Sequence, residues 1–341
     1  MITKWDALGR RRSRRTFLAT ASAAAATVAV PRAVRAASRA KYRVAVIGCT
    51  GRGNYGHGLD LVWLDVPETE VVAVADADPA GLAQAIKRLG NVKGFADYRE
   101  MLEEVKPDLV SVAARWVDQH CEMVTAAAAL GVKGIYLEKP MCRTLAEADQ
   151  MVAACDANHV KLAMAHQTRY SPKIEVLRHV LESGQLGKIL EFRARGKEDA
   201  RGGGEDLWVL GTHVLDLMHL FGGPPRWCAS TVLQAGSPVT RQHVMEGNEG
   251  IGPLAGDEVH AMYMLEGGSV GYFDSVRQGM GNPSRFGLRI FGTQGVLEVH
   301  NTGYLPDVRL LLDSSWSPGR SGKDWVPVSS AGVGEPETML D

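Results

Sequence analysis

The chain has 341 residues, of which 45% are apolar and 23% are charged, and 38 Lys and Arg residues nearly balance 39 Asp and Glu residues. The basic residues are concentrated at the start: residues 1–40 hold nine of them and one acidic residue, so residues 41–341 carry 29 basic and 38 acidic residues and a formal net charge of −9. That charge argues against a nucleic-acid partner. The remaining 301 residues suit two domains with separate cores.

Residues 1–40 are typical of an export signal rather than of a folded segment. A basic block over residues 10–15 overlaps residues 13–18, which are similar to a twin-arginine signal. The alanine-rich run that follows, residues 19–30, is too short and too weakly apolar to span a membrane. The alternative, a basic arm that binds nucleic acid, leaves the alanine run unexplained. We therefore expect export by the twin-arginine route to the periplasm or the extracellular space, with no stable membrane anchor.

The stretch after residue 41 is the most informative part of the chain. Residues 44–47 are a continuous apolar run, typical of a strand buried on both faces, and a glycine-rich turn follows. Apolar residues at helical spacing (Leu59, Leu61, Val62 and Leu64) then predict a helix, whose N-terminus would hold a pyrophosphate. The glycine pattern G-x-G-x-x-G is incomplete. Gly48 and Gly53 fill its outer positions, but Thr50 takes the middle one and Gly51 follows it.

Asp76 strengthens the prediction of a dinucleotide site. It ends the next apolar run, residues 71–75, where a carboxylate can accept hydrogen bonds from both ribose hydroxyls of an adenosine. The same carboxylate would repel a 2′-phosphate, so NAD is the expected cofactor, with NADP kept as the alternative because neighbouring residues can reverse that preference. The simpler reading of Asp76 is a cap for the helix that opens at Pro79.

Helices and strands alternate through the rest of residues 41–165. Apolar periodicity and capping residues predict helices over residues 79–89, 97–105, 118–130 and 144–158. Short apolar runs predict strands over residues 107–113, 132–137 and 161–165. Strands that alternate with helices of this length form a parallel sheet with helices on both faces. The sequence therefore predicts an α/β, Rossmann-type domain over residues 41–165.

Residues 166–300 have a different pattern. Alternating or short apolar runs predict strands, which cover residues 189–195, 259–265, 269–275, 286–291 and 295–300. One predicted helix, residues 206–220, interrupts them. It places Asp206, Val209, His213 and Asp216 along one face, because they are three or four residues apart. Residues 301–341 turn to Pro, Gly and Ser and are expected to form an irregular tail, either naturally short or truncated.

Short motifs along residues 41–300 resemble, in order, those of one enzyme family. They are residues 95–102, His120, Glu138-Lys139-Pro140, residues 145–149, 169–172 and 184–187, Gly211-Thr212-His213 with Asp216, and residues 291–295. Together they are similar to the glucose–fructose oxidoreductase/inositol dehydrogenase (Gfo/Idh/MocA) family. The resemblance implies a Rossmann domain followed by an α+β domain with an open, mainly antiparallel sheet. Such a sheet commonly mediates homo-oligomers.

The resemblance also implies the activity: an NAD(P)-dependent oxidoreductase that moves a hydride between a sugar or polyol carbinol and the nicotinamide. Lys139, at the end of its strand, would hydrogen-bond a sugar hydroxyl and stabilise its alkoxide character, and Pro140 would follow a cis bond. His213 would take the hydroxyl proton. The plainer alternatives are a surface lysine and a packed histidine.

Two positions depart from the family pattern. The family has an Asp four residues before the catalytic His, but Val209 stands there. His213 alone could still take the hydroxyl proton, or either Asp206 or Asp216 could substitute for the missing carboxylate. Arg115-Trp116 stands where the family usually has a Thr-Pro-type turn under the nicotinamide. Tyr170 is a candidate to stack on a sugar ring, although such aromatic residues more often pack.

The predicted site follows from these assignments. The catalytic residues are Lys139 and His213, and the substrate residues are Lys139, Arg169, Tyr170, His213 and Asp216. The cofactor-binding residues are Gly48, Thr50, Gly51, Arg52, Gly53, Asp76, Arg115, His120, Glu138 and Lys139. No metal is predicted, because no His, Cys or Asp residues have convincing ligand spacing.

Two other functions stay open. The same fold can keep its NAD and oxidise a sugar transiently to cleave a glycosidic bond, with no net redox change. A sugar-binding relative without catalysis is the third reading, which Asp76 and Lys139 make less favourable. The five cysteines include no Cys-x-x-Cys pair, and we expect buried thiols rather than disulfides.

Overall fold

The computed structural model describes residues 40–300 and 305–338. Residues 41–341 form one unit, distinct from residues 1–40, and the predicted export signal lies outside the described residues. No helix in the described part is long and apolar enough to cross a membrane. All five cysteines are free thiols; Cys121, Cys142 and Cys155 are buried, as expected, but Cys228 is exposed on a strand.

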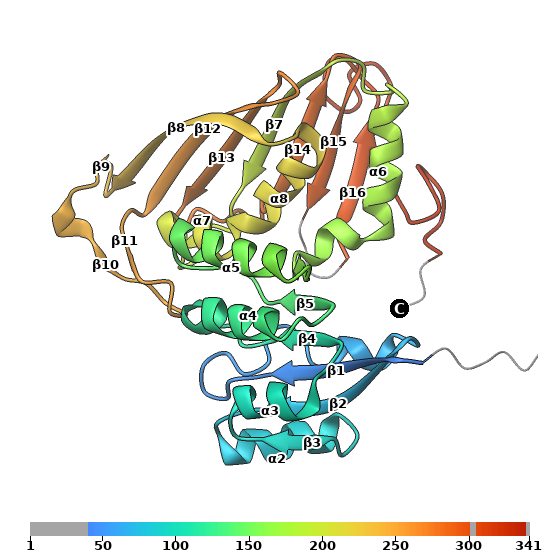
Figure 1. Ribbon diagram of the computed structural model, residues 1–341. Helices are drawn as coiled ribbons and strands as arrows, with labels where there is room; N and C mark the ends of the chain where they lie inside the picture. The colour runs from blue at the N-terminus through green and yellow to red at the C-terminus, as the bar shows by residue number, and fades with distance from the viewer. Residues whose placement is uncertain (1–39, 301–304, 339–341) are drawn as a thin grey trace, which may run out of the picture. The chain divides into compact units, whose positions relative to one another are not determined.

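The first domain is built on a six-stranded parallel sheet of order β3-β2-β1-β4-β5-β6 (Figure 1). Its strands are β1 (Tyr42–Ile47), β2 (Thr69–Ala75), β3 (Lys93–Phe95), β4 (Leu109–Val112), β5 (Gly134–Leu137) and β6 (Lys161–Met164). Residues 44–47 of β1 are buried, as their continuous apolar run predicts. The strand order reverses beside β1, so the crevice where a dinucleotide binds lies beyond the carboxyl ends of β1 and β4.

The helices of this domain begin where their capping residues predict. They are α2 (Pro79–Arg88), α3 (Tyr98–Val105), α4 (His120–Ala129) and α5 (Leu145–Ala157), with the 3-10 turn η2 (Val117–Gln119) before α4. Asp78, Asp97 and Thr144 each accept a backbone N–H of the first turn that follows, which stabilises the helix start. The Rossmann-type fold predicted from the sequence is confirmed.

The predicted helix after the glycine-rich turn is absent. Residues 50–61 are turns, and only the 3-10 segment η1 (Val62–Asp65) follows them. The backbone explains the difference, because five residues have φ between +55° and +84°, which no right-handed helix contains: Gly51, Gly53, Asn54, Gly56 and Gly58. Of the four apolar residues that predicted the helix, only Leu59 is buried. The site therefore has no α-helix N-terminus beside its glycines.

The second domain holds a nine-stranded sheet of order β17-β16-β15-β14-β7-β13-β12-β8-β9, antiparallel except for the pair β7 and β13. Its strands are β7 (Ile189–Arg195), β8 (Pro225–Gln234), β9 (Ser237–Pro238), β12 (Glu258–Leu265), β13 (Val270–Val276), β14 (Gly287–Gly292), β15 (Gly295–His300), β16 (Asp307–Leu311) and β17 (Val326–Pro327). Strands β10 (Met245–Glu246) and β11 (Pro253–Leu254) form a separate small hairpin. The open, mainly antiparallel sheet is confirmed.

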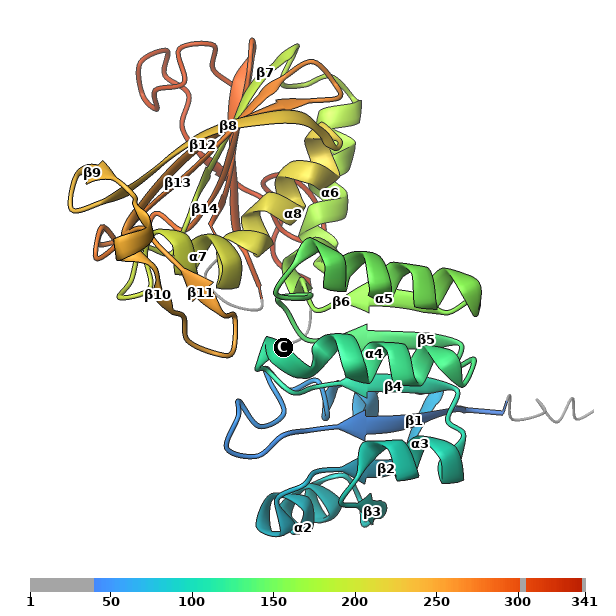
Figure 2. The same cartoon turned by 60° about the vertical axis from the view of Figure 1, so that its left-hand side comes forward.

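One face of this sheet is covered by helices α6 (Pro172–Glu182), α7 (Gly204–Val209) and α8 (Gly211–Gly222), as Figures 1 and 2 show. Phe192 and Phe273 of the sheet pack with Leu217 of α8 in a core that water does not reach. Two short 3-10 segments, η3 (Gln167–Tyr170) and η4 (Arg241–His243), complete the domain.

The prediction of an irregular tail after residue 300 is wrong for part of that segment. Strand β16 pairs with β15, and its Val308 and Leu310 join the core of the sheet. The strand was missed because its alternation of buried and exposed residues covers only five positions. The segments around it are rich in Pro, Gly and Ser, which are typical of loops.

Candidate active site

A cavity of about 190 Å³ lies at the carboxyl ends of β1 and β2. Gly48 and Asp76 line it on one side, and Tyr98 and Arg99 of α3 line it on the other. Its position, where the strand order reverses, is where the adenosine half of a dinucleotide binds in this type of sheet. Asp76 is buried at its edge, as the sequence predicts.

The carboxylate of Asp76 already has partners within the chain. It accepts hydrogen bonds from the N–H of Thr50 (3.1 and 3.2 Å), from the hydroxyl of Thr50 (2.6 Å) and from the N–H of Asp78 (3.0 Å). The cap of α2 is Asp78 rather than Asp76, and Asp76 instead anchors the glycine-rich turn to the end of β2. A ribose bound here would share the carboxylate with Thr50.

Most N–H groups of the glycine-rich turn already donate hydrogen bonds to other atoms of the chain. Those of Gly48, Cys49, Arg52 and Asn54 bond to backbone carbonyls, and that of Gly51 bonds to the side chain of Asn54. Gly53 lies so close to the next segment that a Cβ there would approach the Cβ of Arg115 to 2.4 Å. The turn is tightly packed, so the negative charge of a pyrophosphate would have to be met chiefly by side chains.

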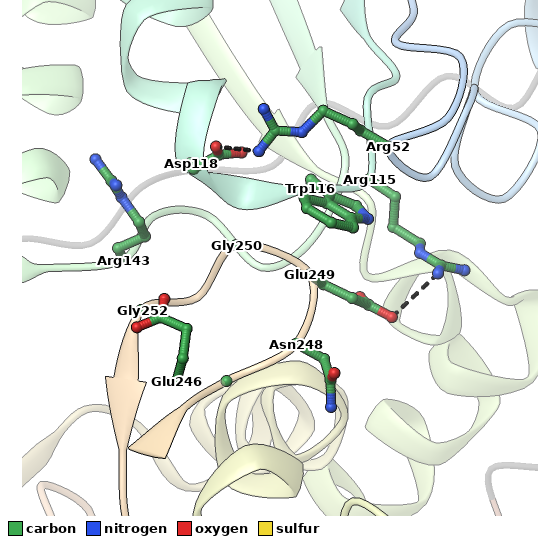
Figure 3. A pocket seen from close by; sticks show the side chains of 11 residues that line it. Arg52, Arg115, Trp116, Asp118, Arg143, Glu246, Asn248, Glu249, Gly250 and Gly252 are labelled. Carbon is green, nitrogen blue, oxygen red and sulfur yellow. Dashed lines mark hydrogen bonds and ion pairs between the residues drawn. The ribbon is translucent and has the colours of Figure 1, made fainter. Parts of the chain in front are cut away.

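Arginine side chains are available nearby, around a cavity of about 650 Å³ shown in Figure 3. Arg52 and Arg115 of the first domain line it together with Arg143. Two carboxylates hold the first two: Arg52 pairs with Asp118, and Arg115 pairs with Glu249 (3.1 Å). The Arg52 guanidinium also lies over the ring of Trp116, at 4.7 Å from its centre. The sequence correctly brings Arg52 and Arg115 to one site.

The loop between β10 and β11 forms the opposite wall of this cavity. It contributes Glu246, Asn248 and Glu249, which the sequence analysis did not identify. The N–H of Val117 donates to the carbonyl of Glu249 (3.1 Å), which fastens the loop to the segment after β4. No short sequence motif identifies this loop, because only the tertiary structure brings it to the cavity that Arg52 and Arg115 line.

Glu138 is fully buried after the end of β5 and is hydrogen-bonded to the segment that follows the glycine-rich turn. Its Oε2 accepts the N–H of His57 (3.2 Å), and its Oε1 lies 3.1 Å from Nδ1 of the same residue. A Cβ on Gly56 would meet Oε2 at 2.4 Å, which explains the glycine there. Glu138 therefore positions the turn rather than contacting the cofactor directly.

Lys139 is also buried, and it points across to the second domain. Its Nζ donates a hydrogen bond to the carbonyl of Val209 (3.0 Å). Burial lowers the pKa of Lys139 from its ordinary value, and the charge of Glu138 partly offsets this effect. The bond between Lys139 and Pro140 is cis, as the family resemblance implies.

The carbonyl of Val209 is free to accept Lys139 because the helix predicted over residues 206–220 is interrupted. It forms two helices, α7 and α8, that meet at Leu210. In a continuous α-helix the carbonyl of Val209 would accept the N–H of His213, but this N–H bonds to Leu210 instead (3.1 Å). The freed carbonyl accepts Lys139.

The side chain of Val209 is fully buried in an apolar cluster with Val117 and Ile251. These residues come from the segment after β4, from α7 and from the loop after β10. The position where the family has a carboxylate is therefore an apolar contact in this chain.

His213 lies at the start of α8 beside a histidine that the sequence analysis placed only at a domain boundary. The rings of His166 and His213 meet edge to face, with centres 5.4 Å apart. Burial, and the nearby positive groups of His166 and Lys139, lower the pKa of His213 to about 3. Nδ1 of His213 and Nε2 of His166 are buried and have no hydrogen-bond partner.

Asp216 and Arg169 complete this cluster. Oδ1 of Asp216 forms an ion pair with Arg169 and lies 3.5 Å from Nδ1 of His166. Asp206, the other candidate to replace the missing carboxylate, is directed elsewhere: it accepts the hydroxyl of Ser275 (2.5 Å) and the N–H of Glu198 (3.0 Å), and it is fully buried. The structure thus places Asp216, not Asp206, beside the histidines.

Two predicted site residues lie outside the cluster. His120 is fully buried, and its ring nitrogens face the carbonyls of Pro140 (2.9 Å) and Ala114 (2.7 Å), so it braces the turn that carries Lys139. The predicted contact of His120 with the cofactor is wrong. Tyr170 is 62% exposed and lines a separate apolar groove with Trp63 and Tyr136, and its place at the substrate stays a prediction.

The arrangement fits the cofactor that the fold implies. A buried carboxylate stands at an adenosine-sized cavity, and two arginines line the larger cavity beyond the glycines. In the described residues, no group of three His, Cys, Asp or Glu side chains is placed to hold a metal ion.

Comparison with known proteins agrees with this geometry. Levoglucosan dehydrogenase from Pseudarthrobacter phenanthrenivorans is 25% identical over 303 residues, which cover 78% of this chain and 77% of that protein. D-apiose dehydrogenase from Paraburkholderia graminis is 32% identical over 202 residues, but these cover 56% of this chain and only 52% of that protein. Myo-inositol 2-dehydrogenase from Thermotoga maritima is 26% identical over 261 residues, 75% of each chain.

Solved structures show the same fold. Levoglucosan dehydrogenase in complex with NADH and levoglucosan superposes with a TM-score of 0.67 at 23% identity, covering 85% of this chain and 81% of that one. Residues 42–166 match the model of the oxidoreductase family with an NAD-binding Rossmann fold, and residues 174–298 match the Gfo/Idh/MocA C-terminal domain. The chain is therefore a member of the Gfo/Idh/MocA family of NAD-binding oxidoreductases.

Proposed function

We propose that this protein is an exported NAD-dependent dehydrogenase that oxidises a carbinol of a sugar or polyol. Two relatives that match three quarters of the chain or more are named for such substrates: levoglucosan and myo-inositol. The observation that carries the proposal is the buried amine of Lys139, which is held by a main-chain carbonyl beside the His166–His213 pair. A hydrogen-bond donor and imidazole groups in one cluster are the groups that alcohol oxidation requires.

Asp76, Arg52 and Arg115 would hold the cofactor. Asp76 would accept the ribose hydroxyls, and the two guanidinium groups would face the pyrophosphate in place of the missing helix N-terminus. When bound, NAD supplies the hydride acceptor. Glu138 and His57 keep the glycine-rich turn in place while the dinucleotide lies over it.

Lys139 would donate its hydrogen bond to the reacting hydroxyl. Its bond to the Val209 carbonyl fixes where the amine points, and burial lowers the pKa of Lys139, which makes the ammonium a stronger hydrogen-bond donor. Arg169, held by Asp216, would orient the remaining hydroxyls of the sugar.

Asp76 is expected to set the cofactor preference. In Asp76→Ala, two charged hydrogen bonds to the ribose are lost, so the affinity for NAD should fall roughly 10–100-fold. The affinity for NADP should rise, because the N–H and hydroxyl of Thr50 become free and Arg99 lines the same cavity. Titration of both cofactors by nicotinamide fluorescence measures this change. Asp149→Ala, on the exposed face of α5, is the control; an unchanged NAD to NADP ratio in Asp76→Ala would remove Asp76 from ribose recognition.

Export rests on residues 13–18 and on the alanine-rich run after them, as does a location in the periplasm or the extracellular space. The twin-arginine route carries folded proteins, so the cofactor would be loaded before export. We further propose a homo-oligomer formed through the sheet of the second domain, because Pro225–Thr231 of β8 are exposed and include Trp227.

The first test is the cofactor content of the exported protein. The protein lacking residues 1–40 is purified without added cofactor and denatured, and the NAD(H) in the supernatant is measured. Levoglucosan, D-apiose and myo-inositol are then supplied with NAD, and absorbance at the NADH band is followed; light scattering of the same preparation gives the oligomeric state. We expect NAD binding and NADH formed in step with product.

The other outcomes separate the alternatives. A protein that binds NAD and converts a glycoside without net NADH is a redox-neutral glycosidase. A protein that binds these sugars without NAD is a binding relative, and the dehydrogenase proposal then fails.

A further inference from the structure

We propose that His166, oriented by Asp216, accepts the proton that leaves the substrate, and that it works with His213 in place of the carboxylate that is absent at position 209. This inference rests on the proposed dehydrogenase function and names the acid–base group of that same site. It would make His166 a catalytic residue and Asp216 a positioning residue.

The first observation is a pair of unsatisfied nitrogens on touching rings. Nδ1 of His213 and Nε2 of His166 are both buried and both lack a hydrogen-bond partner, and the ring centres are 5.4 Å apart. A buried polar atom without a partner costs about 1–3 kcal/mol, so two of them on adjacent rings are costly for folding. Neither nitrogen bonds to the other in this arrangement, so both are available to a group that enters the site, and rotation of either ring would let them exchange a proton.

The second observation is the direction of the His166 ring. Its Nδ1 lies 3.5 Å from Oδ1 of Asp216, an ion-pair distance when the ring is protonated, and its Nε2 is buried without a partner. In the general base of many hydrolases, a carboxylate likewise lies beside one ring nitrogen of a histidine, and the other ring nitrogen takes the proton. Oδ2 of Asp216 is itself buried and unpartnered, so the carboxylate keeps capacity to stabilise an imidazolium.

The third observation is that His213 is a poor final acceptor. Burial, together with the positive groups on His166 and Lys139, holds its pKa at about 3. The neighbouring ring has the Asp216 carboxylate 3.5 Å from its Nδ1, which favours the positive charge there.

The proton balance is simple. The carbinol carbon gives its hydride to the cofactor, and the hydroxyl O–H bond breaks as its proton goes to the nitrogen of His213 that faces the substrate. Once ring rotation brings Nδ1 of His213 and Nε2 of His166 into hydrogen-bonding distance, the hydrogen on Nδ1 passes to Nε2, so His213 ends neutral and His166 becomes an imidazolium beside the Asp216 carboxylate. No further oxidant is needed.

The chain contains a matched control for this arrangement. In the second domain, Nδ1 of His260 lies 2.7 Å from Oδ1 of Asp274, and Asp274 also faces Arg195 at 3.8 Å. This triplet repeats the His166–Asp216–Arg169 contacts on a half-buried part of the sheet. Asp274→Asn therefore makes the same chemical change away from the site.

The first experiment does not need a substrate. Protein labelled with ¹³C-histidine and saturated with NADH is titrated by NMR, and the ring signals of His166 and His213 are assigned with His166→Gln and His213→Gln. If the two rings share one proton, both signals shift over the same pH interval. In Asp216→Asn that interval should move to lower pH, because the carboxylate no longer stabilises the imidazolium; Asp274→Asn should leave it unchanged. A His166 that titrates alone, with no change at His213, overturns the proposal.

The second experiment uses whichever of levoglucosan, D-apiose or myo-inositol the wild-type protein oxidises. Activity should fall at acid pH as the pair takes up a proton before substrate binds. Besides Asp216, the charged groups near the pair are Lys139, His57 and Arg169. Asp216→Asn should lower kcat about 10²-fold and move the acid limb to lower pH, and His166→Gln should lower kcat roughly 10²–10⁴-fold. A lower kcat with an unmoved acid limb in Asp216→Asn would mean a structural role only, which contradicts the relay.

The two proposals fail in different ways. A protein that binds NADH but oxidises none of the three substrates counts against the proposed function, and the NMR titration still decides whether the histidines share a proton. A protein that oxidises one of them while His166→Gln keeps full activity retains the function and loses the relay.

Discussion

Replacing Lys139 by methionine is expected to lower turnover roughly 10²–10⁴-fold while NAD stays bound. Methionine keeps the length and the apolar stem of the side chain but cannot donate a hydrogen bond to the reacting hydroxyl, so the loss falls on the chemical step. The carbonyl of Val209 also loses its donor (3.0 Å), which frees the junction of α7 and α8. Initial rates of NADH formation at saturating substrate measure the effect, and fluorescence titration measures NAD binding.

Lys133→Met is the matched control. Lys133 precedes β5 in the same domain, is mostly exposed and pairs with Asp108, so the same change there should leave turnover within about twofold. If Lys139→Met kept the wild-type rate, Lys139 would have no part in the reaction. If it lost NAD instead, its role would be in cofactor binding.

The second large effect concerns the carboxylate that the family has at position 209. Val209→Asp is expected to destabilise the protein by about 3–5 kcal/mol and to give no increase in activity. The side chain is fully buried between Val117 and Ile251, where an aspartate would be charged without a partner. Urea unfolding followed by circular dichroism measures the free energy of unfolding, and NADH formation measures activity.

Val244→Asp makes the same substitution at a valine that is 49% exposed and should change the free energy of unfolding by about 0.5 kcal/mol or less. A stable Val209→Asp variant with higher turnover would show that position 209 reaches the reacting groups, and it would contradict the apolar role assigned to Val209.

Much of the fold could be predicted from periodicity and capping. Residues 44–47 form a buried strand because they are all apolar, and Asp78, Asp97 and Thr144 mark helix starts because their side chains accept free N–H groups. The prediction of a helix after Gly48 is wrong for a physical reason. Hydrophobic spacing at residues 59–64 suggests a helix, but it carries no information on the left-handed φ angles of the preceding glycines. Backbone conformation decided against the helix.

The site could be predicted only in part. Lys139 and His213 belong to short motifs, and Asp76 follows a recognisable strand. His166 belongs to no such motif and meets His213 only when the end of β6 and the start of α8 come together, 47 residues apart. The sequence could not decide between Asp206, one helical turn before the empty position, and Asp216, one turn after His213. Contacts with Ser275 and His166 separate them.

The hydrogen bond between Lys139 and the carbonyl of Val209 has a consequence for how this site can change through mutation. A partner supplied by the main chain is the same whichever residue occupies position 209, so exchanging that side chain cannot remove it. The partner would instead be lost through insertions, deletions or substitutions that make α7 and α8 continuous, because the N–H of His213 would then take the carbonyl back. The position of Lys139 thus depends on the break between α7 and α8 rather than on the side chain at position 209. Mutations at Leu210 and Gly211 can therefore lower activity, although neither residue carries a reactive group.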